Sequence, residues 1–73
     1  MPIYKDLNGD SNIESYEIFK DAIVVKFKGS SRTYKYSYYS AGQTHVEIMK
    51  QLAVLGDGLN SYIMRNCKYD YEK

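Results

Sequence analysis

Residues 22–28, which read AIVVKFK, decide the fold because they carry the clearest strand pattern in the chain. Successive side chains of a strand point to opposite faces of its sheet, so an alternating pattern separates two faces. One face carries Ile23, Val25 and Phe27, and the other carries Val24, Lys26 and Lys28. The segment therefore predicts a half-buried strand with an apolar inner face and a basic outer face. Phe27 is expected at the centre of the core.

Two further strands flank this segment in the sequence. Residues 14–19 place Tyr16 and Ile18 on one face, and residues 32–38 place tyrosines on one face at positions 34, 36 and 38. The turns between the strands are short, and short turns join antiparallel neighbours. The three strands are therefore predicted to form an antiparallel meander, with the tyrosines on the same side as Ile23.

The second half of the chain has a helical pattern. Residues 44–55 and 58–67 place apolar side chains three and four positions apart, which is the spacing of a buried helical stripe. Gly56 is expected to end the first helix in a left-handed conformation, and Asp57 to cap the second. Strands followed by helices indicate an α+β domain with the order β-β-β-α-α, in which two helices pack on one face of the sheet.

The length of 73 residues is enough for one small core. We expect a polar lead-in at residues 1–12, the folded domain at residues 13–68 and a short tail at residues 69–73. Cys67 is the single cysteine, so neither an internal disulfide nor a metal site with several thiolates can form. The first residues lack an apolar leader, and the sequence has no run long enough to span a membrane. We expect a cytoplasmic protein without a membrane partner.

Residues 6–17 give the strongest match to a cation-binding motif. The acidic and amide side chains from Asp6 to Glu17 fit several ligand positions of a twelve-residue calcium loop. However, Ser11 occupies the position where that loop needs glycine for a sharp turn. The residues from Glu14 onward also have a strand pattern, whereas a calcium loop is flanked by helices. A solvated acidic turn is therefore favoured over a calcium site.

Residues with catalytic potential are isolated from one another in the sequence. His45 is the lone histidine, and without a second ligand or a nucleophile near it a surface or helix-capping role is favoured. Cys67 lies on the apolar stripe of the second helix, which favours a buried small side chain over a nucleophile. We therefore expect neither an enzyme nor a cofactor or metal site.

A cluster of cations is the main indication of a binding function. The net charge is only +1, so attraction to a polyanion has to come from local clustering. Pairing of the strands brings Lys26, Lys28 and Lys35 onto one exposed face, with Arg32 near the hairpin end and Tyr39 as an outward aromatic ring. A basic sheet face can follow a phosphate backbone. Soluble sheets also carry charged outer faces for structural reasons alone, and that alternative stays open.

Several short segments occur together in the order and at the spacing of a known small domain. They are Ser11-Asn12-Ile13, Tyr16, Ile23-x-Val25-x-Phe27, Tyr34-Lys35-Tyr36, Leu52-Ala53 and Gly58-Leu59-Asn60-Ser61-Tyr62-Ile63. On these segments, from residue 11 to about residue 69, the chain resembles the KTSC family. That family is named for a C-terminal segment of some lysyl-tRNA synthetases and includes small free-standing bacterial proteins. Many members follow the Tyr-x-Tyr element with a Val-Pro pair, whereas this chain has Ser40-Ala41-Gly42, so the start of the first helix is expected to differ.

The resemblance implies RNA as the ligand class, through the association with a synthetase, but it implies no defined activity. Together with the cationic face, it favours a small non-enzymatic module that binds RNA through Lys26, Lys28 and Lys35. The alternative is a protein-interaction or structural domain, including a homo-oligomer. Its contact residues would be Tyr39, Tyr69 and Tyr71, because tyrosine is frequent in protein interfaces.

Overall fold

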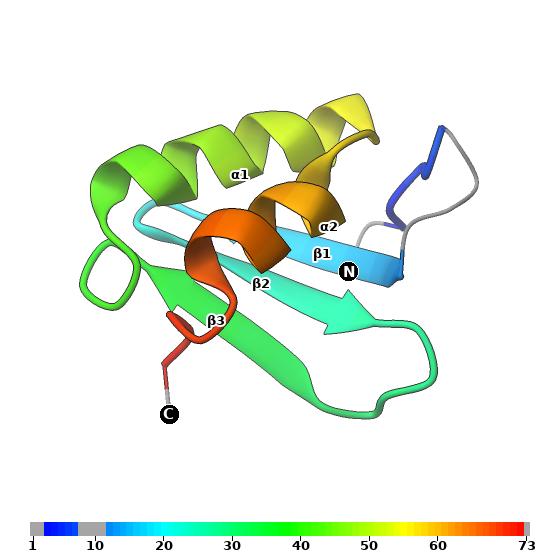
Figure 1. Ribbon diagram of the computed structural model, residues 1–73, viewed down its shortest axis with the longest axis horizontal. Coiled ribbons are helices and arrows are strands. Elements are labelled where there is room, and N and C mark those ends of the chain that lie inside the picture. Colours follow the sequence, from blue (N-terminus) through cyan, green and yellow to red (C-terminus); the bar gives the residue numbers. More distant parts are fainter. Residues whose placement is uncertain (1–2, 8–11, 73) are drawn as a thin grey trace.

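The computed structural model describes residues 3–7 and 12–72, and in these ranges three antiparallel strands form one sheet in the order β1-β2-β3. The strands are β1 (Ile13–Phe19), β2 (Ala22–Phe27) and β3 (Thr33–Ser37). The helices lie together on one face of this sheet and form a second layer (Figure 1). They are α1 (Gln43–Leu55), α2 (Leu59–Tyr62) and the π-helical turn η1 (Ile63–Cys67) that continues α2. The predicted α+β fold with the order β-β-β-α-α is confirmed.

The strand register places the predicted apolar side chains beneath the helices. Ile23 lies opposite Tyr36, and Val25 lies opposite Tyr34. Residues opposite each other in an antiparallel pair point to the same face. Ile23, Val25 and Tyr36 are almost completely buried. The predicted parity is therefore confirmed, and the tyrosines of β3 face the helices.

The core fills the space between the two layers and includes a residue from the predicted lead-in. Its buried members are Tyr4, Ile13, Ile23, Val25, Tyr36, Val46, Met49, Ala53, Leu59, Ile63 and Cys67. Tyr4 is held from two sides: its N–H donates to the carbonyl of Glu14 at 3.0 Å, and the N–H of Leu59 donates to its hydroxyl at 3.3 Å. The segment before β1 thus contributes to the folded domain.

Phe27 lies at the margin of the core, which corrects the expectation that it would be central. It is the last residue of β2 and is only partly buried, although it packs against the core. At this end of the sheet α2 and η1 leave a cleft that the Phe27 ring lines. Alternation along a strand identifies the buried face, but it does not say how far along that face the helices extend.

The boundary between the helices depends on two glycines. Gly56 ends α1 with φ 83°, and its N–H donates to the carbonyl of Leu52 at 2.9 Å, as a left-handed stop requires. A Cβ at Gly56 would lie 2.6 Å from the Cβ of Lys5, so a side chain has no room. The N-cap of α2 is Gly58, without a side-chain cap, and not Asp57 as predicted, because the chain makes a second left-handed turn before the helix begins. Within the described ranges, no helix has the length and apolarity needed to cross a membrane.

Candidate functional site

The outer face of the sheet is less basic than the sequence predicts. Lys26 and Lys35 point outward from neighbouring strands as expected, opposite Thr33 and Val24 respectively. Each of the predicted lysines, however, meets a carboxylate. The pairs are Lys26 Nζ–Glu14 Oε2 at 2.6 Å, Lys28 Nζ–Asp6 Oδ2 at 3.2 Å and Lys35 Nζ–Glu72 Oε1 at 4.0 Å. An adjacent opposite charge cancels much of the field that would attract a phosphate.

Arg32 and Tyr39 do not join the lysines of the outer face. The guanidinium carbon of Arg32 lies 5.1 Å from the ring centroid of Tyr34 and 5.7 Å from that of Tyr71, on the face that the helices cover. The reason is parity, because Arg32 precedes Tyr34 by two residues and so points the same way. Tyr39 is 99% exposed in the turn that follows β3. The five predicted contact residues therefore do not form one surface.

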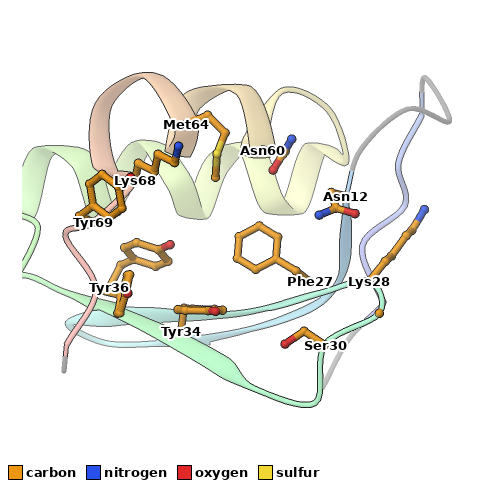
Figure 2. Close-up of a pocket in the computed structure, with 12 residues that line it drawn as sticks. Asn12, Phe27, Lys28, Ser30, Tyr34, Tyr36, Asn60, Met64, Lys68 and Tyr69 are labelled. Atoms are coloured by element: carbon orange, nitrogen blue, oxygen red, sulfur yellow. The ribbon is translucent and has the colours of Figure 1, made fainter.

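An open cleft of about 450 Å³ lies between the end of the sheet where the turn joins β2 to β3 and the helical segment formed by α2 and η1 (Figure 2). We call it the aromatic cleft. It is lined by Asn12, Phe27, Lys28, Gly29, Ser30, Tyr34, Tyr36, Asn60, Met64, Lys68, Tyr69 and Tyr71. Its volume is in the usual range of small-molecule sites, roughly 300–1,000 Å³. The π-helical turn η1 supplies Met64, and such turns are frequent at functional sites.

Aromatic rings form the floor and one side of the cleft. The ring centroids of Phe27 and Tyr34 lie 5.4 Å apart, those of Tyr34 and Tyr71 4.8 Å apart, and each pair meets edge to face. Tyr71 also meets the buried Tyr36 at 6.2 Å. Figure 2 shows Tyr34 lying flat over the sheet and Phe27 standing between the sheet and the helices. Because the rings support one another, the walls are in place without a ligand.

The C-terminal tail provides the Tyr71 wall. The N–H of Glu72 donates to the carbonyl of Lys35 at 2.7 Å, and the N–H of Asp70 donates to the carbonyl of Cys67 at 3.0 Å. These bonds fix Tyr71 on both sides, next to the rings of β3. The predicted tail is thus a structural part of the cleft, and Tyr69, which is 68% exposed, stands at its margin.

The cleft combines cationic side chains with a neutral phenol. It is lined by Lys68 and by Lys28, whose ammonium group pairs with Asp6, and the guanidinium of Arg32 lies over two of its rings. The Tyr36 phenol is neutral at pH 7, and burial, then the neighbouring Cys67, raise its pKa further. An aromatic surface with ammonium groups around it is suited to a planar ligand that carries a negative charge.

His45 forms a contact that the sequence did not predict. Its Nδ1 lies 2.6 Å from the hydroxyl of Tyr62, so it links α1 to α2. The helix-capping alternative is wrong, because the N-cap of α1 is Gly42 and has no side-chain cap. The half-buried ring therefore acts as a bridge between helices.

Cys67 is completely buried, as predicted. Burial, with a smaller effect of Asp70, raises the pKa of its thiol. A buried neutral thiol is a poor nucleophile, which fits the interpretation of Cys67 as a small core residue.

The predicted calcium-like segment lies partly outside the described residues, at positions 8–11. Of the part that is described, Asp6 pairs with Lys28, and Glu14 and Glu17 belong to β1. No cluster of three or more histidine, cysteine or acidic side chains with metal-binding geometry occurs among the described residues. The strand at Glu14 and Glu17 agrees with the expectation that a helix does not follow this turn.

A second polar cluster ties the end of β3 to α1. The hydroxyl of Tyr38 donates to Glu47, Lys50 Nζ lies 2.9 Å from the same carboxylate, and Lys50 Nζ donates to the carbonyl of Lys20 at 2.8 Å. The hydrogen bond from Tyr38 and that from Lys50 lower the pKa of Glu47. The cluster fixes the position of the helix and lies apart from the aromatic cleft.

Sequence reasoning did not find the aromatic cleft, although part of its signal was present. The strand pattern predicts Phe27 and Tyr34 on one face, as the structure has them, and Tyr69 and Tyr71 are among the contact residues of the protein-interaction alternative. The missing information was that the tail folds back beside β3 and that the helices leave this end of the sheet open. Both depend on contacts between segments far apart in the sequence.

Comparison with protein-family models, with curated proteins and with solved structures finds no significant match to this chain. The resemblance to the KTSC family therefore stays a prediction, and the geometry of the cleft is the main indication of function.

Proposed function

We propose that this protein is a small non-enzymatic binding module for single-stranded RNA, with the aromatic cleft as its contact site. The observation that supports this most directly is the combination of ring faces with ammonium and guanidinium groups in one hollow. Proteins that bind single strands combine the same two elements, since bases stack on the rings and cations hold the phosphates. Membership of the KTSC family, proposed from the sequence segments, points to the same ligand class. A cytoplasmic location is part of this proposal.

The proposed contact differs from the outer lysine face that the sequence favours. Lys26 and Lys35 have carboxylate partners and do not line the aromatic cleft. Lys68 instead points along the cleft (Figure 2). Lys28 lines the cleft as well, although its ammonium group also pairs with Asp6. Phosphates at these two ammonium groups would leave the attached base next to the aromatic floor.

The test compares two double variants that remove equal charge. Lys28→Gln with Lys68→Gln alters the cleft, and Lys26→Gln with Lys35→Gln alters the outer face. Binding of a labelled mixed-sequence single-stranded RNA is measured by fluorescence anisotropy at several salt concentrations. We expect the cleft variant to bind at least about fivefold more weakly and to lower the salt slope by about 1.4, because each phosphate contact with a single strand contributes about 0.7.

The control variant is expected to bind nearly as well as the unmodified protein. Loss of binding in the control alone would move the site to the outer face and overturn the cleft. No binding by the unmodified protein at low salt would overturn RNA as the ligand.

A protein partner is the second candidate function, and a separate observation favours it. Ile18, Val54 and Leu55 are each at least 40% exposed and line a shallow apolar groove between β1 and α1. Exposed apolar clusters of this kind are common at protein interfaces. Sedimentation velocity over a wide concentration range tests self-association through this groove, and a monomer throughout would remove the homo-oligomer version.

A further inference from the structure

The aromatic cleft has a polar end as well as an aromatic floor. Asn12, just before β1, and Asn60, on α2, both line the cleft. Figure 2 shows the two side chains at the same end, on the side of Phe27 away from Tyr36 and Tyr69. Each amide offers a donor and an acceptor, which is the pairing needed to recognise the hydrogen-bonding edge of a planar heterocycle.

The charges decide which kind of planar ligand fits. Aromatic rings alone can enclose a quaternary ammonium group. Here Lys68 lines the same hollow and Arg32 lies over two of its rings, so a cationic ligand would be repelled. A ligand that joins a neutral ring to an anionic group fits the cleft, because the ring can stack on the aromatic floor and the anionic group is attracted to the cationic side chains.

The size of the cleft limits the ligand to one such unit. About 450 Å³, open on one side, is suited to a single ring system with part of its attached sugar. A base in a duplex is stacked on both faces and paired at its edge. It therefore has neither a free face nor a free pairing edge to offer to this site.

We propose that the aromatic cleft binds one unpaired nucleobase, which stacks on Tyr34 and is recognised at its edge by Asn12 and Asn60, with its phosphate at Lys68, at the opposite end of the cleft (Figure 2). This inference depends on the proposed RNA function and narrows its ligand to an unpaired nucleotide in a loop, a bulge or a chain end. The base, and not the backbone alone, then provides a large part of the affinity.

The first experiment uses small probes and the full-length labelled protein. Each of the four nucleoside 5′-monophosphates, and ribose 5-phosphate as the control without a base, is titrated while amide and side-chain NMR shifts are recorded. We expect the nucleotides to shift the side-chain amide signals of Asn12 and Asn60, and ribose 5-phosphate to leave them unchanged. Equal shifts with ribose 5-phosphate would overturn the base pocket and indicate a simple phosphate site.

The second experiment uses a matched pair of tyrosine variants and an abasic oligonucleotide. Tyr34→Leu removes the proposed stacking ring, whereas Tyr39→Leu removes a ring that is 99% exposed outside the cleft. Stacking of one base on a ring predicts roughly 5- to 150-fold weaker RNA binding for Tyr34→Leu and little change for Tyr39→Leu. Because Tyr34 is half-buried, Asn60→Ala serves as a variant less disruptive to folding, and it should reduce the discrimination among the four nucleotides.

The outcomes separate the two proposals. Binding of RNA with equally tight binding of an abasic strand of the same length would overturn the base pocket but leave RNA as the ligand. Failure of both RNA and mononucleotides to bind would overturn both proposals. Displacement of the nucleotides by an acidic, phenylalanine-containing peptide at lower concentration would also overturn the base pocket and indicate a protein ligand.

Discussion

Two alanine substitutions on the same face of β2, Ile23→Ala and Phe27→Ala, should differ in how much stability they cost. The sequence alone, which places Phe27 at the centre of the core, predicts the opposite order. Ile23→Ala removes fewer atoms than Phe27→Ala, yet we expect it to cost more stability. Ile23 is completely buried between Ile18 on one strand and Tyr36 on the other. Its truncation leaves a closed cavity, and such changes cost about 2–5 kcal/mol, so about 3–4 kcal/mol is expected.

Phe27 is a different case because its ring already lines an open cleft. Truncation there enlarges a hollow that solvent reaches, so the cavity contribution is small. What remains is the loss of apolar burial, which for a completely buried large side chain is about 1.5–3 kcal/mol. For the partly buried Phe27 we expect a cost of about 1.5–2 kcal/mol.

Urea unfolding followed by far-UV circular dichroism measures the difference. With a slope of about 1 kcal/mol/M for a small domain, the two unfolding midpoints should lie about 1–2.5 M apart. A domain of this length is expected to have about 4–11 kcal/mol of stability, so both variants are measured in added sulfate, which strengthens burial and keeps Ile23→Ala folded. A cost for Phe27→Ala that equals or exceeds that of Ile23→Ala would refute the reasoning, because it would mean that the cleft is closed in solution.

Two further predictions concern a backbone position and a buried phenol. Gly56→Ala should destabilise the protein by about 2–3 kcal/mol, because an L-residue is strained at φ 83° and its Cβ would lie 2.6 Å from that of Lys5. Gly29→Ala serves as the control, because Gly29 has φ 77° but open space around it, and it should cost only about 1 kcal/mol in thermal unfolding. Equal losses of stability in the two variants would show that the contact with Lys5 is unimportant. Burial raises the pKa of Tyr36 above its ordinary value of 10.0, so at higher pH the unfolded chain loses this proton first and the free energy of unfolding falls. Tyr36→Phe should make the decrease in urea midpoint between about pH 8 and pH 11 smaller, and an unchanged decrease would assign the alkaline instability to other groups.

The fold was predictable from the sequence because its signals are local. The alternation around Val25 sets which side chains face the helices, and the left-handed glycine at position 56 ends α1 where the apolar stripe ends. The site was predictable only in part. The outward direction of Lys26 and Lys35 followed from parity, but their carboxylate partners come from other segments of the chain and are not visible in a local pattern.

By itself, the sequence determined the order of the elements, the buried face of each strand and the stripe of each helix, because these depend on side-chain spacing within a few residues. The tertiary structure alone decided that Tyr4 enters the core, that Phe27 stays at its margin and that the tail places Tyr71 beside Tyr34. Each of these outcomes depends on how closely two distant segments approach each other. That distance is set by the packing of the whole domain, and here it leaves an aromatic cleft where the alternating pattern alone predicts a filled core.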